Sequence, residues 1–236
     1  MSQQKPAEPT SKTAVRISAA GVEISAELGN IPHSPDVAFR RGVVVFAHGS
    51  GSSRLSPRNQ FVANILQEHG FTTLLLDLLT EDEQYVISKR FDISLLTTRL
   101  VEAIHWVVAH PILMALPLGL FGASTGAAAA LRAAAVAHAS VAAVVSRGGR
   151  TDLTGALISR VRAPTLLIVG SEDREVLALN QETLGRLSCE KRLAIIPGAT
   201  HLFEEQGALD DVAHLAAYWF KNHLLPKIDQ AEPIHP

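Results

Sequence analysis

Cysteine is almost absent from the sequence, because Cys189 is the single thiol among 236 residues. One cysteine excludes an internal disulfide and a metal site built from clustered thiolates, and it favours a reducing compartment. Net charge is nearly absent as well, since 21 basic and 23 acidic side chains leave a formal charge of −2. Such a balance gives no long-range attraction to nucleic acid or to an anionic membrane. We expect neither as a partner.

Long apolar runs are also missing. The most apolar region, residues 127–145, is rich in alanine and is interrupted by Arg132 and His138, which makes it too weak for a transmembrane helix. The first twelve residues are polar and lack the apolar core of a secretory signal. We interpret residues 1–12 and 226–236 as disordered tails around a single domain, residues 13–225, of a cytoplasmic protein.

The sequence does contain a regular alternation of strand and helix patterns. Residues 14–19 and 22–28 alternate around an Ala-Gly turn and predict a β-hairpin. Further strands are predicted at residues 41–49, 71–79, 118–124, 141–149, 163–173 and 191–201. Helices are predicted at residues 56–70, 92–111, 125–137, 153–160, 176–187 and 208–225. The alternation predicts an α/β fold, in which helices cover both faces of a mostly parallel sheet with the hairpin as an antiparallel edge.

The motif Gly-Ala-Ser-Thr-Gly, residues 122–126, follows a predicted buried strand and opens an alanine-rich helix. A serine on such a sharp turn has a strained backbone, and glycines two residues away on either side remove Cβ atoms that would clash. Alanine favours the helix and lets it pack close to the sheet. The alternative is a tight glycine-rich turn with an incidental serine. We interpret Ser124 as the nucleophile of a hydrolase.

A serine hydroxyl is a poor nucleophile at neutral pH, so it needs a base, and the base needs an orienting acid. Asp173 and His201 follow two successive predicted strands, which places both at the carboxyl ends of strands, on the same edge of the sheet as Ser124. The chain order of serine, acid and histidine is that of the α/β-hydrolase fold. Glu172 and Asp152 are the alternatives for the acid.

A glycine- and serine-rich stretch, residues 46–54, ends the first predicted parallel strand. Acyl transfer builds negative charge on the substrate oxygen, which fixed N–H donors must stabilise. We expect the backbone N–H groups of Thr125 and Ser50 to form this oxyanion hole, with Gly51 as the alternative to Ser50 and as a substrate-binding residue. His48 is expected to support the loop and not to act as the base. The alternative is a flexible loop without a catalytic role.

Arginines recur at the same edge of the predicted sheet. They are Arg54, Arg58, Arg147, Arg150 and Arg174. Guanidinium groups suit carboxylate or phosphate recognition through paired hydrogen bonds. Arg54 and Arg147 are therefore candidate substrate-binding residues for an anionic group. The alternative is that these arginines pair with acidic side chains or strand-end carbonyls of the protein itself.

Four stretches carry a resemblance to a known family. They are HGSGSSR (48–54), GASTGAAAAL (122–131), SRGGR (146–150) and GATHLFEE (198–205). With them the chain resembles the serine α/β-hydrolases, specifically small dienelactone-hydrolase-related proteins without a large cap domain, including hydrolase-like domains sometimes joined to phosphoribosyltransferase domains. The resemblance spans roughly residues 42–224. Dienelactone hydrolase proper uses a cysteine nucleophile, so the serine at position 124 argues against dienelactone itself as the substrate.

The expected function is that of a serine esterase that cleaves a small-molecule ester through an acyl-enzyme, without a metal or an organic cofactor. A thioesterase, an amidase or another acyl-transfer enzyme could use the same residues. A non-catalytic, ligand-binding descendant of the fold is the alternative from a different class. Residues 78–92 follow a strand and are expected to overhang the pocket and to contribute to substrate choice. The oligomeric state is not indicated by the sequence.

Overall fold

The computed structural model describes residues 12–30 and 41–224 of the chain. The tails predicted for residues 1–12 and 226–236 lie outside this described part, except for Lys12, which begins the first strand.

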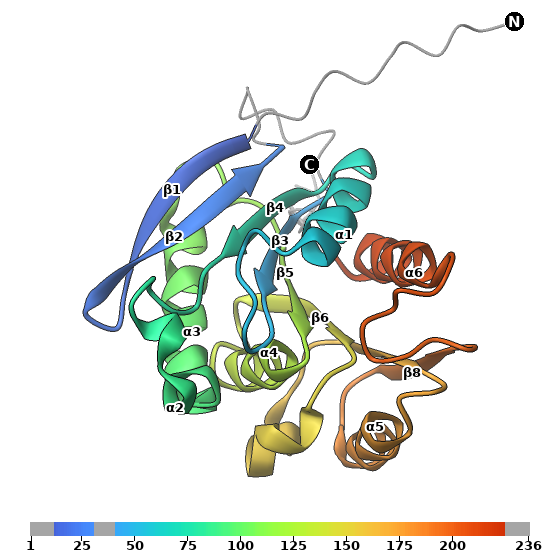
Figure 1. Cartoon of the computed structure of the whole chain (residues 1–236). Coiled ribbons are helices and arrows are strands. Elements are labelled where there is room, and N and C mark those ends of the chain that lie inside the picture. Colours follow the sequence, from blue (N-terminus) through green and yellow to red (C-terminus); the bar gives the residue numbers. More distant parts are fainter. Residues whose placement is uncertain (1–11, 31–40, 225–236) are drawn as a thin grey trace, which may run out of the picture.

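An eight-stranded sheet forms the centre of the molecule, in the order β1-β2-β4-β3-β5-β6-β7-β8 (Figure 1). The strands are β1 (Lys12–Ala19), β2 (Val22–Gly29), β3 (Val43–Ala47), β4 (Thr72–Leu76), β5 (Leu118–Ala123), β6 (Val141–Arg147), β7 (Thr165–Gly170) and β8 (Lys191–Ile196). β1 and β2 form the predicted hairpin, and β2 joins β4 in antiparallel register. All remaining pairs are parallel. The predicted sheet, mostly parallel with an antiparallel edge, is confirmed.

Helices cover both faces of the sheet, as predicted. They are α1 (Pro57–Glu68), η2 (Glu83–Tyr85), α2 (Ile87–Arg90), α3 (Ile93–Ala109), α4 (Thr125–Val136), η3 (Thr151–Arg160), α5 (Arg174–Arg186) and α6 (Ala208–His223). α1 and α6 pack on one face over one apolar core, and α3 and α4 enclose a second core on the other. None of the described helices combines the length and the hydropathy that crossing a lipid bilayer requires. The short helices η2 and α2 were not predicted.

The parallel strands bring distant parts of the chain to one edge. Ser124 directly follows β5, Arg147 ends β6, and the turns after β7 and β8 carry Asp173 and His201. Ligands of open α/β sheets bind outside the carboxyl ends of the strands. We call this edge the rim of the sheet.

Candidate active site

Ser124 lies at the sharp bend between β5 and α4. Its backbone adopts φ 52° and ψ −121°, a conformation that non-glycine residues adopt only at an energetic cost. Three hydrogen bonds hold this backbone in place. The Ser124 N–H donates to the carbonyl of Arg147 at 3.1 Å, and the Ser124 carbonyl accepts from the N–H groups of Ala127 at 3.0 Å and Arg150 at 3.1 Å. The bend therefore fixes the serine at the rim, as the sequence motif predicts.

The two glycines that flank the bend are required by packing. A Cβ atom on Gly126 would lie 2.2 Å from the carbonyl oxygen of Ala47, and one on Gly122 would lie 2.5 Å from Cα of Ala127. Both contacts are far too short for any side chain. Small residues around Ser124 thus allow α4 to rest directly on the ends of β3 and β5.

The structure brings His201 and Asp173 into direct contact. His201 Nδ1 lies 2.6 Å from Asp173 Oδ2, and the two turns are also joined by a hydrogen bond of 3.0 Å from the N–H of Glu172 to the carbonyl of Ala199. A carboxylate that accepts from Nδ1–H leaves the lone pair of Nε2 available as a base. This is the arrangement that a serine nucleophile requires from its acid and base.

The alternative acids are engaged elsewhere. Glu172 forms an ion pair with Arg174 at 3.5 Å, and Asp152 accepts two hydrogen bonds of 2.9 Å from Arg150. Neither is the partner of His201. Within residues 12–30 and 41–224, no group of three His, Cys, Asp or Glu side chains is placed to hold a metal ion.

Ser124 and His201 border the same corner of the rim. The N–H of Ser124 donates to the carbonyl of Arg147, and a Cβ atom on the next residue, Gly148, would lie 3.4 Å from Nδ1 and Cε1 of His201. In the described part of the chain, His201 is hydrogen-bonded to Asp173 but not to the hydroxyl of Ser124. Catalytic hydrogen bonds of this type often tighten only when substrate is bound.

The predicted oxyanion residues lie next to each other. We call residues 48–51 the oxyanion turn. This turn contacts Ser124, since a Cβ atom on Gly49 would lie 3.0 Å from Cβ of Ser124. Thr125 is the first residue of α4, so its N–H has no intrahelical partner. The N–H of Ser50, however, already donates to Oγ1 of Thr125 at 2.8 Å. The sequence did not predict this hydrogen bond.

His48 fastens the oxyanion turn to the end of β4. Its Nε2 accepts the N–H of Leu78 at 3.0 Å, and its Nδ1 lies 2.9 Å from the carbonyl of Gly49. Because Nε2 accepts, Nδ1 must carry the proton and donate to Gly49. Burial lowers the pKa of His48, which favours this neutral ring. The contacts are those of a supporting residue and not of a base.

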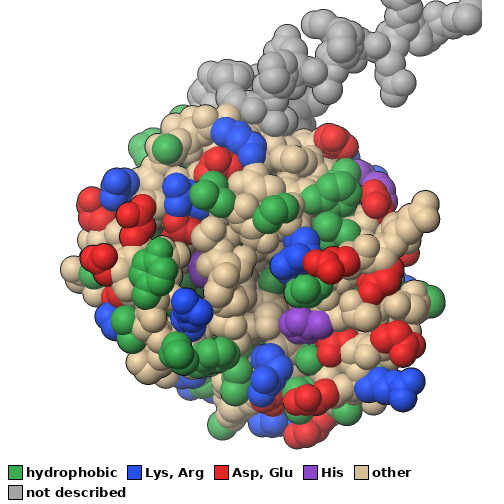
Figure 2. Space-filling model, in the orientation of Figure 1, with side chains coloured by type: hydrophobic (Ala, Val, Ile, Leu, Met, Phe, Trp, Pro, Cys, Tyr) green, Lys and Arg blue, Asp and Glu red, His purple; other side chains and the backbone are tan. Residues whose placement is uncertain are grey.

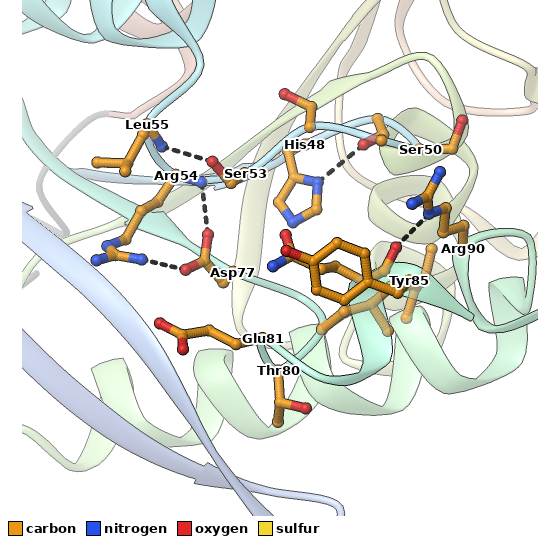
Figure 3. A pocket seen from close by; sticks show the side chains of 16 residues that line it. His48, Ser50, Ser53, Arg54, Leu55, Asp77, Thr80, Glu81, Tyr85 and Arg90 are labelled. Carbon is orange, nitrogen blue, oxygen red and sulfur yellow. Dashed lines mark hydrogen bonds and ion pairs between the residues drawn. The ribbon is translucent and has the colours of Figure 1, made fainter. Parts of the chain in front are cut away.

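A cavity of about 230 Å³ lies between the oxyanion turn and residues 77–90, which we call the cavity wall. Figure 3 places the hydrogen-bonded pair of Arg54 and Asp77 on one side of this cavity and Tyr85 and Arg90 on the other. Gly51 also lines it, whereas the three triad candidates do not. Gly49 borders both the cavity and Ser124. The cavity therefore adjoins Ser124 across the oxyanion turn.

A buried ion pair, missed in the sequence, anchors the cavity wall. Arg99 on α3 donates to the carboxylate of Glu83, with Nη2 at 2.9 Å from Oε1, and to the carbonyl of Leu78 at 2.9 Å. Lys89 also pairs with Glu83, at 2.8 Å. Hydrogen bonds from Arg99 are the main cause that lowers the pKa of Glu83 far below its ordinary value. The signal in the sequence was an arginine on the apolar face of a predicted helix.

Most of the rim arginines have partners within the protein. Arg54 pairs with Asp77, Arg58 with Glu204, Arg150 with Asp152 and Arg174 with Glu172. Figure 2 accordingly shows basic and acidic side chains interspersed over this face, with neither sign dominant. For these four arginines the structure agrees with the alternative considered in the sequence. Arg147 is different, since no acidic side chain of the described residues pairs with it.

Comparisons with known proteins agree with the fold. No protein-family model matches the chain. A solved dienelactone hydrolase from Anabaena variabilis is 50% identical, with a TM-score of 0.86, over 92% of this chain and 99% of that one. A solved α/β serine hydrolase without lid from Xanthomonas campestris is 22% identical, with a TM-score of 0.71, over 98% of this chain and all of that one, and it supports the fold alone.

A curated protein of Mycobacterium tuberculosis, provisionally named a phosphoribosyl transferase, is 51% identical over 210 residues. The match covers 89% of this chain and 46% of that protein, so the chain spans about half the length of the curated relatives it matches.

Proposed function

Because this chain belongs to the dienelactone hydrolase family of α/β hydrolases, we propose that it is a serine esterase that cleaves a small carboxylic ester through an acyl-enzyme on Ser124. One observation carries the proposal: the hydrogen bond of 2.6 Å between His201 and Asp173 lies on the same rim as a serine held at positive φ. A histidine that is oriented by a carboxylate can take the proton of a serine hydroxyl and so activate it for acyl transfer.

Acylation begins when Oγ of Ser124 attacks the carbonyl carbon of the ester and its proton passes to Nε2 of His201. Asp173 holds the imidazole in the tautomer that can accept this proton and stabilises the imidazolium that forms. The negative charge that develops on the carbonyl oxygen is stabilised by the backbone N–H groups of Thr125 and Ser50. Helix α4 adds the partial positive charge of its N-terminus at the same place.

The tetrahedral intermediate collapses when the bond from carbon to the alcohol oxygen breaks. The alcohol leaves with the proton from Nε2 of His201. A water molecule then gives a proton to Nε2 as it attacks the acyl carbon, and Ser124 leaves with that proton. The cycle releases a carboxylic acid and restores the enzyme, and every proton in it moves through one imidazole.

We place one half of the ester in the cavity beside the oxyanion turn. Two cationic side chains that line it, Arg54 and Arg90, are matched in number by two carboxylates, Asp77 and Glu81. A lining of balanced charge suits a neutral polar group, which can donate and accept hydrogen bonds without leaving a buried charge unpaired. Residues of the cavity wall would therefore contribute to substrate choice.

A fluorophosphonate probe tests the proposal, since it forms a covalent adduct with an activated serine. We expect mass spectrometry of the labelled, folded protein to locate the adduct on Ser124. Ser124→Ala should abolish labelling, whereas Ser159→Ala, at an exposed serine on η3, is the matched control and should label normally. Folded wild-type protein that resists the probe would contradict the esterase and favour a ligand-binding descendant of the fold.

A second experiment separates esterase from related acyl-transfer activities. An ester, a thioester and an amide with the same acyl group are compared by kcat/KM. We expect the ester to be the best substrate of the three. A higher kcat/KM for the thioester or the amide would leave Ser124 as the nucleophile but show that the enzyme is a thioesterase or an amidase.

A further inference from the structure

Arg147 is a charged side chain that the fold buries without a partner. It is only 8% exposed, and its Nη1 atom is fully buried with no hydrogen bond among the described residues. Buried charges in proteins are normally paired, because taking an ion out of water costs several kcal/mol. An unpaired guanidinium in this position points to a site suited to an anion.

The alternation of β6 fixes the side on which Arg147 lies. Ala143 and Val145 pack in the core beneath α1 and α6, and residues two apart on a strand share a face. Arg147 therefore extends toward the same side, where Arg58 is the second residue of α1. Burial, and to a lesser extent the charge of Arg58, lowers the pKa of Arg147 to about 10. The side chain thus remains a cation at neutral pH.

Arg58 contributes a second cation at this position. Its Nε is buried without a partner, and the one carboxylate that reaches it, Glu204 at 3.1 Å, is 65% exposed. Such exposed ion pairs are weak. The first turn of α1 contains no acidic residue, so the partial positive charge of the helix N-terminus adds to the two guanidinium groups. The local charge favours an anion.

Arg147 is also adjacent to the candidate nucleophile. It pairs with Ala123 across β5 and β6, and its carbonyl accepts the N–H of Ser124. The next residue, Gly148, borders His201. In the sheet, β5 has β3 and then β4 on one side and β6 on the other. The segments that follow β3 and β4 line the cavity. A group bound at Arg147 would lie on the other side of Ser124 from the cavity.

We infer that Arg147 and Arg58 form a subsite for an oxyanion, a carboxylate or a phosphate carried by the substrate, on the β6 side of Ser124. The inference rests on the proposed ester hydrolysis, because it assigns the anionic half of the ester to this subsite and the neutral half to the cavity. Guanidinium groups recognise both anions through paired, charge-assisted hydrogen bonds.

Two matched esters test the subsite. Mono-p-nitrophenyl succinate carries a carboxylate, and p-nitrophenyl butyrate is a neutral ester of similar length. We expect the wild type to favour the succinate, measured as the ratio of the two kcat/KM values. Arg147→Met should lower this ratio about 10- to 100-fold, the loss expected when a hydrogen-bonded charge pair loses one member.

Two further variants control the measurement. Arg58→Met should lower the ratio by a smaller factor, because Arg58 is partly exposed, and it serves as the test if Arg147→Met does not fold. Arg160→Met removes an exposed arginine at the end of η3 and should leave the ratio unchanged. A ratio that neither Arg147→Met nor Arg58→Met alters would overturn the subsite, while labelling of Ser124 and ester hydrolysis would stand.

Thermal unfolding gives a readout that does not depend on catalysis. Inorganic phosphate or succinate should raise the Tm of the wild type more than that of Arg147→Met, because an anion that binds only the folded state stabilises it. A shift with phosphate alone identifies the anion as phosphate, and a shift with succinate alone identifies it as carboxylate. If neither ester is hydrolysed, the proposed function fails, and equal Tm shifts in the two proteins would then reject the subsite as well.

Discussion

Arg99 and Arg147 are both almost completely buried, but only Arg99 has a hydrogen-bonded acidic partner. Arg99, 2% exposed, donates to the carboxylate of Glu83 and to the carbonyl of Leu78. Arg147, 8% exposed, has a fully buried Nη1 without any partner in the described structure. The first arginine anchors the cavity wall to α3, and the second lies beside Ser124 at the rim.

The difference separates a structural charge from a charge reserved for a ligand. In a buried ion pair with good geometry each charge compensates the other, and removing one member leaves the other unpaired, which lowers the stability of the fold. A buried cation without a partner already bears that cost, and it becomes favourable only when an anion binds. The fold therefore gives up some stability at the rim, which is a common property of functional sites.

The largest expected effect comes from a variant that changes neither arginine. Ser124→Ala removes the proposed nucleophile, and we expect kcat/KM for p-nitrophenyl butyrate to fall by at least about a thousandfold. The free energy of unfolding in urea should stay within about 1 kcal/mol of the wild type, because only a partly exposed hydroxyl is lost. Residual activity above one-thousandth of the wild type would contradict a nucleophilic Ser124.

Removing one charge at each site tests the comparison between Arg99 and Arg147. Glu83→Gln leaves Arg99 with a neutral partner that can still accept a hydrogen bond, and we expect the free energy of unfolding to fall by about 1–3 kcal/mol. Arg147→Met removes an unpaired charge and should not lower it, because a buried cation is replaced by an apolar side chain of similar length. Urea unfolding without added anions measures both. Equal losses in the two variants would show that Arg147 is held by interactions as strong as those of Arg99.

Acid titration should distinguish the ion pair from simple packing. The pKa of Glu83 in the folded protein lies well below its ordinary value of 4.5, so its charge contributes stability above that value, which is lost as the pH falls below it. Wild-type stability should therefore decline more steeply than that of Glu83→Gln between about pH 5 and pH 3. Unfolding in urea across this range measures the difference. Parallel curves would indicate that the pKa of Glu83 does not change on folding.

The rim and the residues that it brings together were predictable because local patterns carry them. Buried runs of branched residues predicted the strands, and the small residues around Ser124 predicted the bend. Asp173 and His201 followed from their places after two neighbouring strands, since parallel strands bring their carboxyl ends to one edge. The structure hydrogen-bonds these last two side chains to each other. That contact follows from the order of β7 and β8 in the sheet.

The pairing of charges was not predictable, because partners come from distant segments. Arg58 and Glu204 are separated by 146 positions in the sequence, and Arg54 and Asp77 by 23. Only the packed fold decides which of several arginines lacks a carboxylate. The short helices in residues 83–90 were missed for another reason, since one turn is too short to produce a periodic apolar pattern.

The smallest effect is expected at a donor that, like Arg99, has its partner within the chain. Ser50 N–H donates to Oγ1 of Thr125, so the substrate oxygen must share this N–H or displace the hydroxyl. Thr125→Val removes the hydroxyl and places a methyl group against the N–H, which should lower kcat about tenfold, less than the loss of a whole donor.

Two further substitutions at Thr125 decide what the hydroxyl does. Thr125→Ser keeps a hydroxyl and should recover most of the rate lost in Thr125→Val. Thr125→Ala leaves space beside the Ser50 N–H, so this donor can reach the oxyanion directly and the loss should be smaller than in the valine variant. A kcat for Thr125→Val above that of the wild type would mean that the hydroxyl competes with the substrate oxygen. The Ser50 N–H would then resemble Arg147, because the hydrogen-bond partner of each group in the working enzyme would be the ligand.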